Sequence, residues 1–138
     1  MKNNIIILFG FSGSGKSTMA NLLGKRFGLR IIHPSGILRK LLEKKPIDLK
    51  KTQYNKGFWE SEKGIKLFKD RLQEETPLDI LSDEIILNEI GKGTIVIDSW
   101  SLPWLTTKGI KIYLKTSLNV RAKRVAKRSK ISYKKALK

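Results

Sequence analysis

IIILFGFSGSGKST, residues 5–18, is the stretch that decides the fold of this 138-residue chain. The unbroken apolar run Ile5–Phe9 predicts a strand buried on both faces of a parallel sheet. Residues Gly10–Ser17 follow it in the pattern G-x-x-x-x-G-K-S, and apolar residues at helical spacing come next. A buried strand, a glycine-rich turn and a helix are the context in which this pattern forms a phosphate-binding loop, the P-loop.

The residues of the predicted P-loop each have a chemical task. Its glycines allow positive φ, so successive backbone N–H groups can surround a phosphate, and the next helix adds its positive end. Lys16 can reach the β- and γ-phosphates of a nucleoside triphosphate, and the Ser17 hydroxyl can ligate Mg²⁺. We therefore predict ATP and Mg²⁺ as cofactors. The predicted cofactor-binding residues are Gly10, Phe11, Ser12, Gly13, Ser14, Gly15, Lys16, Ser17 and Thr18.

Asp98 stands at the end of a second apolar run, Thr94–Asp98. The carboxyl ends of parallel strands share one edge of the sheet, so this carboxylate would face the phosphate site and hold Mg²⁺ directly or through water. An aspartate that only caps a turn is the alternative interpretation. We predict Ser17 and Asp98 as the metal-binding residues.

Beyond these runs, the sequence alternates strands with helices. Short apolar runs predict further strands over Leu29–His33 and Ile110–Leu114, and helical spacing of apolar residues predicts helices between the strands. This alternation is typical of an α/β protein, and we expect a three-layer P-loop fold with a parallel sheet of four visible strands. The long helical block at residues 35–91 predicts an inserted subdomain within a single domain, residues 1–138.

The composition of the chain excludes several other classes of protein. The chain has no cysteine, which excludes a disulfide framework and a thiolate metal site, and its first apolar run is too short for a membrane span. We expect a cytoplasmic protein with no membrane partner. The net charge is +17, and residues 115–138 hold ten Lys or Arg and no acid. This basic segment is either a grip for RNA or phosphate, or a solvated helix face.

A single histidine and three tryptophans leave their roles open. His33 has no second histidine with which to form a metal site, and phosphoryl transfer needs little help from a general base, so we interpret it as a loop residue without catalytic duty. Trp59, Trp100 and Trp104 either stack against a base or fill the core and an interface.

The sequence resembles the nucleoside-monophosphate kinases, and most closely the archaeal-type cytidylate kinases. The resemblance covers nearly the whole chain. Its motifs are the opening IIILFGFSGSGKSTMANLLGKRFGL, the segment HPSGILR at residues 33–39, the strand TIVID, the strand IKIYLK at residues 110–115, VRAKRVAKR at residues 120–128 and ISYKKAL at residues 131–137.

This resemblance implies roles for several residues. Arg39 would grip the acceptor phosphate, in one substrate-binding segment with Ser35 and Gly36. Arg124 would lie near the donor base and Arg128 near the transferring phosphate. The implied catalytic residues are Lys16, Asp98, Arg124 and Arg128. Residues 35–91 would form the monophosphate-binding subdomain, and residues 129–138 the start of a lid.

The sequence also departs from the family pattern. After Asp79 and Asp83 it has Glu84-Ile85-Ile86 where the family places arginines, and Ser99-Trp100 where another arginine is usual. The rest of the lid, the last helix and the fifth strand of the pattern are absent from this sequence.

The expected activity is Mg²⁺-dependent transfer of the γ-phosphate of ATP to a nucleoside monophosphate, with CMP favoured. The alternatives are a P-loop nucleotide-binding or RNA-associated protein with weak or no acceptor phosphorylation, and a kinase of another small acceptor. The sequence does not fix the oligomeric state.

Overall fold

Four parallel strands form the centre of the computed structural model, which describes residues 4–51, 57–75 and 77–138. The strand order is β2-β3-β1-β4, and every neighbouring pair is parallel. The strands are β1 (Ile5–Phe9), β2 (Arg30–Ile32), β3 (Ile95–Asp98) and β4 (Ile110–Tyr113). All four lie within the runs that the sequence predicted, and the α/β fold class is confirmed.

Helices connect the strands, and most of them were predicted. The helix that begins at Leu78 ends at Leu87, and the chain then continues as hydrogen-bonded turns, while the four-residue helix α5 was not predicted. Between β2 and β3 the described residues form a series of helices, which we call the helical block. The helices are α1 (Lys16–Phe27), α2 (Pro34–Leu42), α3 (Glu62–Asp70), α4 (Leu78–Leu87), α5 (Leu102–Leu105), α6 (Leu118–Ser129) and α7 (Tyr133–Ala136), with the 3₁₀ turns η1 (Leu49–Lys51) and η2 (Arg71–Gln73).

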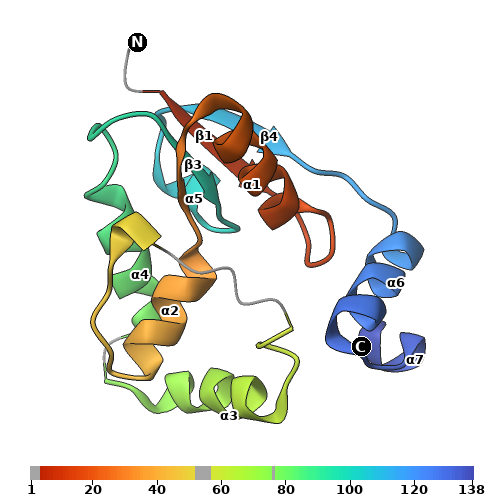
Figure 1. The fold of residues 1–138 in the computed structure, drawn as a ribbon. Helices are drawn as coiled ribbons and strands as arrows, with labels where there is room; N and C mark the ends of the chain where they lie inside the picture. Colours follow the sequence, from red (N-terminus) through yellow and green to blue (C-terminus); the bar gives the residue numbers. More distant parts are fainter. Residues whose placement is uncertain (1–3, 52–56, 76) are drawn as a thin grey trace.

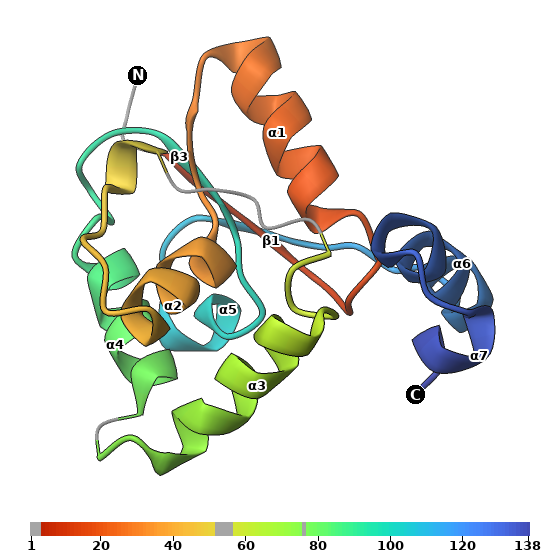
Figure 2. The ribbon, with the colours of Figure 1, turned by 60° about the horizontal axis from the view of Figure 1, so that its bottom comes forward.

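The two central strands, β1 and β3, are buried on both faces because all of their residues except Asp98 are apolar. On one face, alternate residues of β1 and β3 pack against buried Ile37 of α2, Ile86 of α4 and Leu102 of α5. On the other face, Leu8 and Val96 pack with α1. Figures 1 and 2 show α1 on the opposite side of the sheet from α2, α4 and α5. The three layers follow from the period of two along each strand.

Part of the apolar surface stays exposed. On α1, Leu22 is 57% and Phe27 62% exposed, although the helical spacing of these residues was the signal for the helix. Small buried residues of α1, Ala20 and Gly24, face the sheet instead. Every residue of β4 is exposed as well. The apolar spacing therefore predicted the helix correctly, and of its members Leu23 packs against the core while Leu22 and Phe27 do not.

The helix α6 lies beside the P-loop at the end of the chain. Its N-cap Ser117 accepts a hydrogen bond from the backbone N–H of Val120, and Lys130 ends it in a left-handed conformation. Contact with the P-loop is close: a Cβ atom at Gly13 would lie 2.8 Å from the carbonyl oxygen of Arg121. Within the described ranges, no helix has both the length and the apolar character that crossing a membrane requires.

Candidate active site

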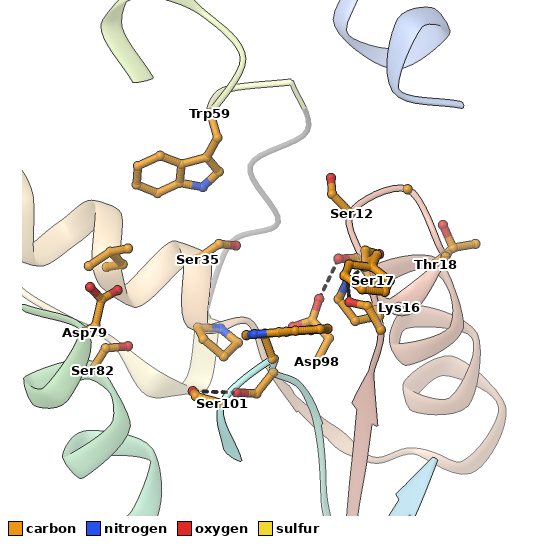
Figure 3. A pocket seen from close by; sticks show the side chains of 18 of the residues that line it. Ser12, Lys16, Ser17, Thr18, Ser35, Trp59, Asp79, Ser82, Asp98 and Ser101 are labelled. Carbon is orange, nitrogen blue, oxygen red and sulfur yellow. Dashed lines mark hydrogen bonds between the residues drawn. The ribbon is translucent and has the colours of Figure 1, made fainter. Parts of the chain in front are cut away.

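A cavity of about 800 Å³ opens at the carboxyl ends of the strands, between the P-loop and the helical block. This is the edge at which open α/β sheets bind their ligands, where the chain turns from one side of β1 to the other. Figure 3 shows P-loop residues on one side of the cavity and Trp59, Asp79 and Ser82 on the other. The cavity is lined by Gly10, Phe11, Ser12, Gly13, Gly15, Lys16, Ser17, Thr18, Pro34, Ser35, Leu38, Trp59, Glu60, Arg71, Asp79, Ser82, Asp83, Asp98, Ser99, Trp100, Ser101, Arg124 and Arg128.

The P-loop has the backbone that a phosphate cradle needs. Gly10, Gly13 and Gly15 all have positive φ, and a Cβ at Gly10 would lie 2.7 Å from the carbonyl oxygen of Leu114. The ammonium of Lys16 folds over the loop and donates to the carbonyl oxygens of Gly10 at 2.6 Å and Phe11 at 3.0 Å. Burial lowers the pKa of Lys16, although Asp98 opposes this effect.

Asp98 lies directly beside the P-loop because β3 pairs with β1. Leu8 is its partner across the two strands, and the Ser17 hydroxyl donates to Asp98 Oδ2 at 2.5 Å. The described residues contain no group of three or more His, Cys, Asp or Glu that could hold a metal alone. A hydroxyl and one carboxylate beside a phosphate cradle fit Mg²⁺, which usually takes one or two carboxylates and completes its shell with phosphate oxygens and water. A P-loop of the kinase type implies the use of ATP, generally together with Mg²⁺.

Three arginines of α6 face the P-loop, because positions 121, 124 and 128 share one side of a helix. Arg124 donates to the carbonyl oxygens of Gly13 at 3.3 Å and Ser14 at 3.4 Å. The guanidinium of Arg121 lies 4.8 Å from the centre of the Phe11 ring. Part of the basic segment is therefore turned toward the predicted phosphate site.

Arg128 joins the P-loop to the helical block. Its Nη2 donates to Ser12 Oγ at 3.2 Å and to Glu60 Oε1 at 2.7 Å. Its Nε is buried and has no hydrogen-bond partner among the described residues. A buried donor without a partner carries a desolvation cost that an anionic ligand would remove.

The far side of the cavity carries both donors and carboxylates. Arg71 pairs with Asp79 at 3.0 Å, while its Nε and the indole nitrogen of Trp59 are buried without a hydrogen-bond partner in the described part of the chain. Asp83 accepts from the Ser101 hydroxyl at 2.8 Å. Burial raises the pKa of Asp83, and this hydrogen bond opposes the rise.

Not every predicted site residue lines this cavity. Ser14, Gly36 and Arg39 are outside its lining. Arg39 donates to Glu43 Oε1 at 3.1 Å and lies 3.7 Å from the centre of the Phe58 ring. The spacing of Arg39 and Glu43 on a helix, i and i+4, was a readable signal for this pair. The guanidinium that does line the acceptor side, Arg71, was not predicted.

The structure also places the residues whose roles were left open. Trp59 lines the cavity, Trp100 stacks on Phe11 with ring centres 5.1 Å apart, and Trp104 is 78% exposed. His33 is buried beside Asp98. His33 lies outside the helices and strands, between β2 and α2, as the sequence predicted, whereas its burial beside Asp98 was not predicted.

Three comparisons with known proteins agree with this geometry. A family model described as an AAA domain matches residues 6–137. The cytidylate kinase of Ignicoccus hospitalis is 30% identical over 96% of this chain and 69% of its own length. The cytidylate kinase of Sulfurisphaera tokodaii is 33% identical over 96% of this chain and 67% of its length. This chain thus spans about two thirds of these relatives.

Solved structures support the fold alone. Shikimate kinase from Bacteroides thetaiotaomicron superposes with a TM-score of 0.60 at 15% identity, over 97% of this chain and 72% of its own. Four observations agree on the family of this chain. They are the P-loop, the acid beside it, the family match over residues 6–137 and the sequence identity to the two relatives. The chain belongs to the AAA-domain family of P-loop kinases, together with the archaeal cytidylate kinases that it resembles.

Proposed function

We propose that this chain transfers the γ-phosphate of ATP to a nucleoside monophosphate, with CMP as the favoured acceptor. The observation that carries the proposal is the cavity itself. It joins the P-loop on one side to the carboxylates of Asp79 and Asp83 and to two buried donors on the other. Among the described residues these donors, Nε of Arg71 and the indole nitrogen of Trp59, have no hydrogen-bond partner. A transferase needs such adjoining sites, because donor and acceptor must meet in line without water between them.

On the donor side, the loop amides and Lys16 would hold the β- and γ-phosphates. Lys16 now donates to two carbonyl oxygens of the loop, and it would exchange these for phosphate oxygens. Ser17 and Asp98 would hold Mg²⁺, which when bound neutralises charge on the two terminal phosphates. Arg124 and Arg128 would stabilise the charge that shifts during transfer.

On the acceptor side, Arg71 is the guanidinium best placed to hold the monophosphate. Its unpartnered Nε and the indole N–H of Trp59 both suit a phosphate oxygen, and Ser35 lines the same wall. Arg39 remains a second candidate, but it would first have to leave Glu43. Gly36 would act only through the backbone of α2.

The reaction would form a bond between an oxygen of the acceptor phosphate and the γ-phosphorus. The bond from that phosphorus to the β–γ bridging oxygen breaks, and ADP leaves. Closure of the helical block, residues 35–91, and of residues 129–138 over the cavity would exclude water.

Two observations support CMP within this proposal. The relatives above carry the name cytidylate kinase. In the cavity, Asp83 offers a partly buried carboxyl beside Ser82 and Ser101. Such an oxygen can accept a hydrogen bond from the exocyclic amino group of cytosine, where uracil has a carbonyl. A cytoplasmic location is a further prediction of this function.

An assay of ADP release tests the proposal with each ribonucleoside monophosphate in turn. Release should depend on CMP and be lost in Lys16→Ala. Lys25→Ala removes the same charge from an exposed position of α1 and should keep full activity. ATP binding without acceptor-dependent release of ADP, together with salt-sensitive RNA binding, would overturn the proposal in favour of a binding protein.

The acceptor site can be tested separately. Arg71→Met should raise the KM for CMP by about tenfold or more, the scale of a lost charge-assisted hydrogen bond. The KM for ATP should stay within about twofold. Arg39→Met is the matched variant, and a larger effect there would move the acceptor phosphate to Arg39.

A further inference from the structure

His33 is a buried residue placed between two elements of the site. It is 3% exposed and follows β2 directly. Its Nδ1 lies 3.0 Å from Asp98 Oδ1, and its Nε2 lies 3.3 Å from Asn21 Oδ1 on α1. The pairing of Ile32 with Ile97 sets the ends of β2 and β3 side by side, which makes His33 and Asp98 neighbours.

Asp98 divides its two oxygens between two partners. Oδ2 accepts from the Ser17 hydroxyl at 2.5 Å, and Oδ1 faces His33. A carboxylate oxygen is a hydrogen-bond acceptor, so a hydrogen bond between these two atoms runs from the Nδ1–H of His33 to Asp98 Oδ1. With the Asp98 side chain only 6% exposed, these two bonds replace most of the water that a carboxylate would otherwise need.

We propose that His33 is a positioning residue for the pair Ser17–Asp98, and this inference rests on the function proposed above. By holding Oδ1, the imidazole prevents rotation of the carboxylate, so that Oδ2 stays on Ser17 and both oxygens present a fixed arrangement to Mg²⁺. Outer partners of metal ligands set ligand orientation in this way. The side chain of Asn21 lies against the far nitrogen of the ring, with its Oδ1 3.3 Å from Nε2.

The same residue fixes the start of the acceptor helix. His33 is the N-cap residue of α2, and its carbonyl oxygen accepts from the backbone N–H groups of Gly36 at 3.0 Å and Ile37 at 3.4 Å. Ser35, which lines the cavity, therefore stands two residues from the group that orients Asp98. One residue thus links the metal pair to the first turn of the acceptor subdomain.

Two substitutions separate positioning from packing. In His33→Asn the amide nitrogen occupies the place of Nδ1 and can still donate to Asp98. In His33→Gln the amide nitrogen matches Nε2 instead, so the bond to Asp98 is lost. For each variant, the affinity for ATP is measured with Mg²⁺ and again with EDTA, and thermal melting reports on folding.

We expect Mg²⁺ to tighten ATP binding in the unchanged protein and in His33→Asn. In His33→Gln this Mg²⁺-dependent gain should fall by about tenfold, the lower range for a lost outer partner. The affinity for metal-free ATP should differ by no more than about twofold among the unchanged protein and the two variants, because the P-loop is unchanged. A full Mg²⁺ effect in His33→Gln overturns the inference, and so does equal loss in both variants with a common drop in melting temperature.

Two further results keep the inference testable on its own. If neither histidine variant folds, Asn21→Ala decides, because it removes the far partner from an exposed position. A reduced Mg²⁺ effect there supports the inference, and an unchanged one overturns it. The binding assay needs no phosphoryl transfer, so a protein that transfers nothing but loses its Mg²⁺ effect in His33→Gln would refute only the proposed function.

Discussion

Arg128 and Glu60 form an ion pair of 2.7 Å between residues 68 positions apart in the sequence. Both residues line the cavity, and the pair connects α6 to the segment just before α3. Both side chains are partly buried, at 24% and 22% exposure. The arginine proposed to stabilise the transferring phosphate is thus neutralised by a carboxylate from the helical block.

Glu60→Gln should strengthen ATP binding. The change frees Arg128 and removes a negative charge from the neighbourhood of the phosphates, so we expect the Kd for ATP to fall by about two- to fivefold, on the scale of a partly exposed ion pair. Isothermal titration measures this effect. Glu75→Gln, an exposed acid outside the cavity, is the control for net charge, and weaker binding in Glu60→Gln would show that Glu60 orients Arg128 instead.

ATP binding should take up protons at alkaline pH. Burial lowers the pKa of Lys16 in the free protein, and the negative triphosphate would raise it again. Above the lowered pKa, the protein must bind a proton to restore the ammonium, so affinity should decline as pH rises. Titration calorimetry in buffers of different ionisation enthalpy detects this uptake. It should vanish in Lys16→Arg, because arginine keeps its proton throughout.

Glu43 should stabilise the folded protein at all but strongly acidic pH. A hydrogen bond from Lys45 and a second from Arg39 lower the pKa of Glu43 from 4.5 to about 2. Because the folded state has the lower pKa, the contribution is complete above pH 4.5 and is lost as the pH falls toward 2. In urea denaturation, Glu43→Gln should be less stable than the unchanged protein at neutral pH. A difference that persists undiminished at pH 2 would contradict this assignment.

Gly13→Ala should destabilise the contact between the P-loop and α6. The new Cβ would lie 2.8 Å from the backbone carbonyl oxygen of Arg121, at a φ of +78°. Gly28→Ala is the matched control, because its φ is also positive but nothing lies within 4 Å of its Cβ. We expect a loss of about 1 kcal/mol at Gly28 and about 2–4 kcal/mol at Gly13 in urea denaturation. Equal losses would show that α6 moves aside without cost.

The sequence predicted the parts of the site that depend on local pattern and sheet type. Apolar runs identified β1 and β3, and the P-loop motif identified the phosphate cradle. Asp98 could be placed near the loop because all carboxyl ends of a parallel sheet share one edge. None of these inferences needed the order of the strands.

The contacts that could not be predicted depend on strand order or on distant segments. The place of His33 beside Asp98 follows only once β2 is known to pair with β3. Glu60 meets Arg128 because the helical block folds over the sheet. A contact between such distant segments produces no periodic pattern in the sequence. The outward direction of Leu22 and Phe27 depends on the small residues that α1 turns to the sheet, and a stripe of apolar residues does not show which side is covered.

In bulk solution, the exposed apolar side chains of β4 and α1 favour association between molecules, whereas the net positive charge opposes it. At +17, repulsion between copies reaches about 30 Å at 0.01 M salt but only about 3 Å at 1 M. Sulfate and phosphate salts also strengthen apolar attraction. The colloidal stability of this protein should therefore be electrostatic in origin, so that concentrated stocks keep best in dilute salt and added sulfate brings the molecules together through Phe27, Ile110 and their neighbours.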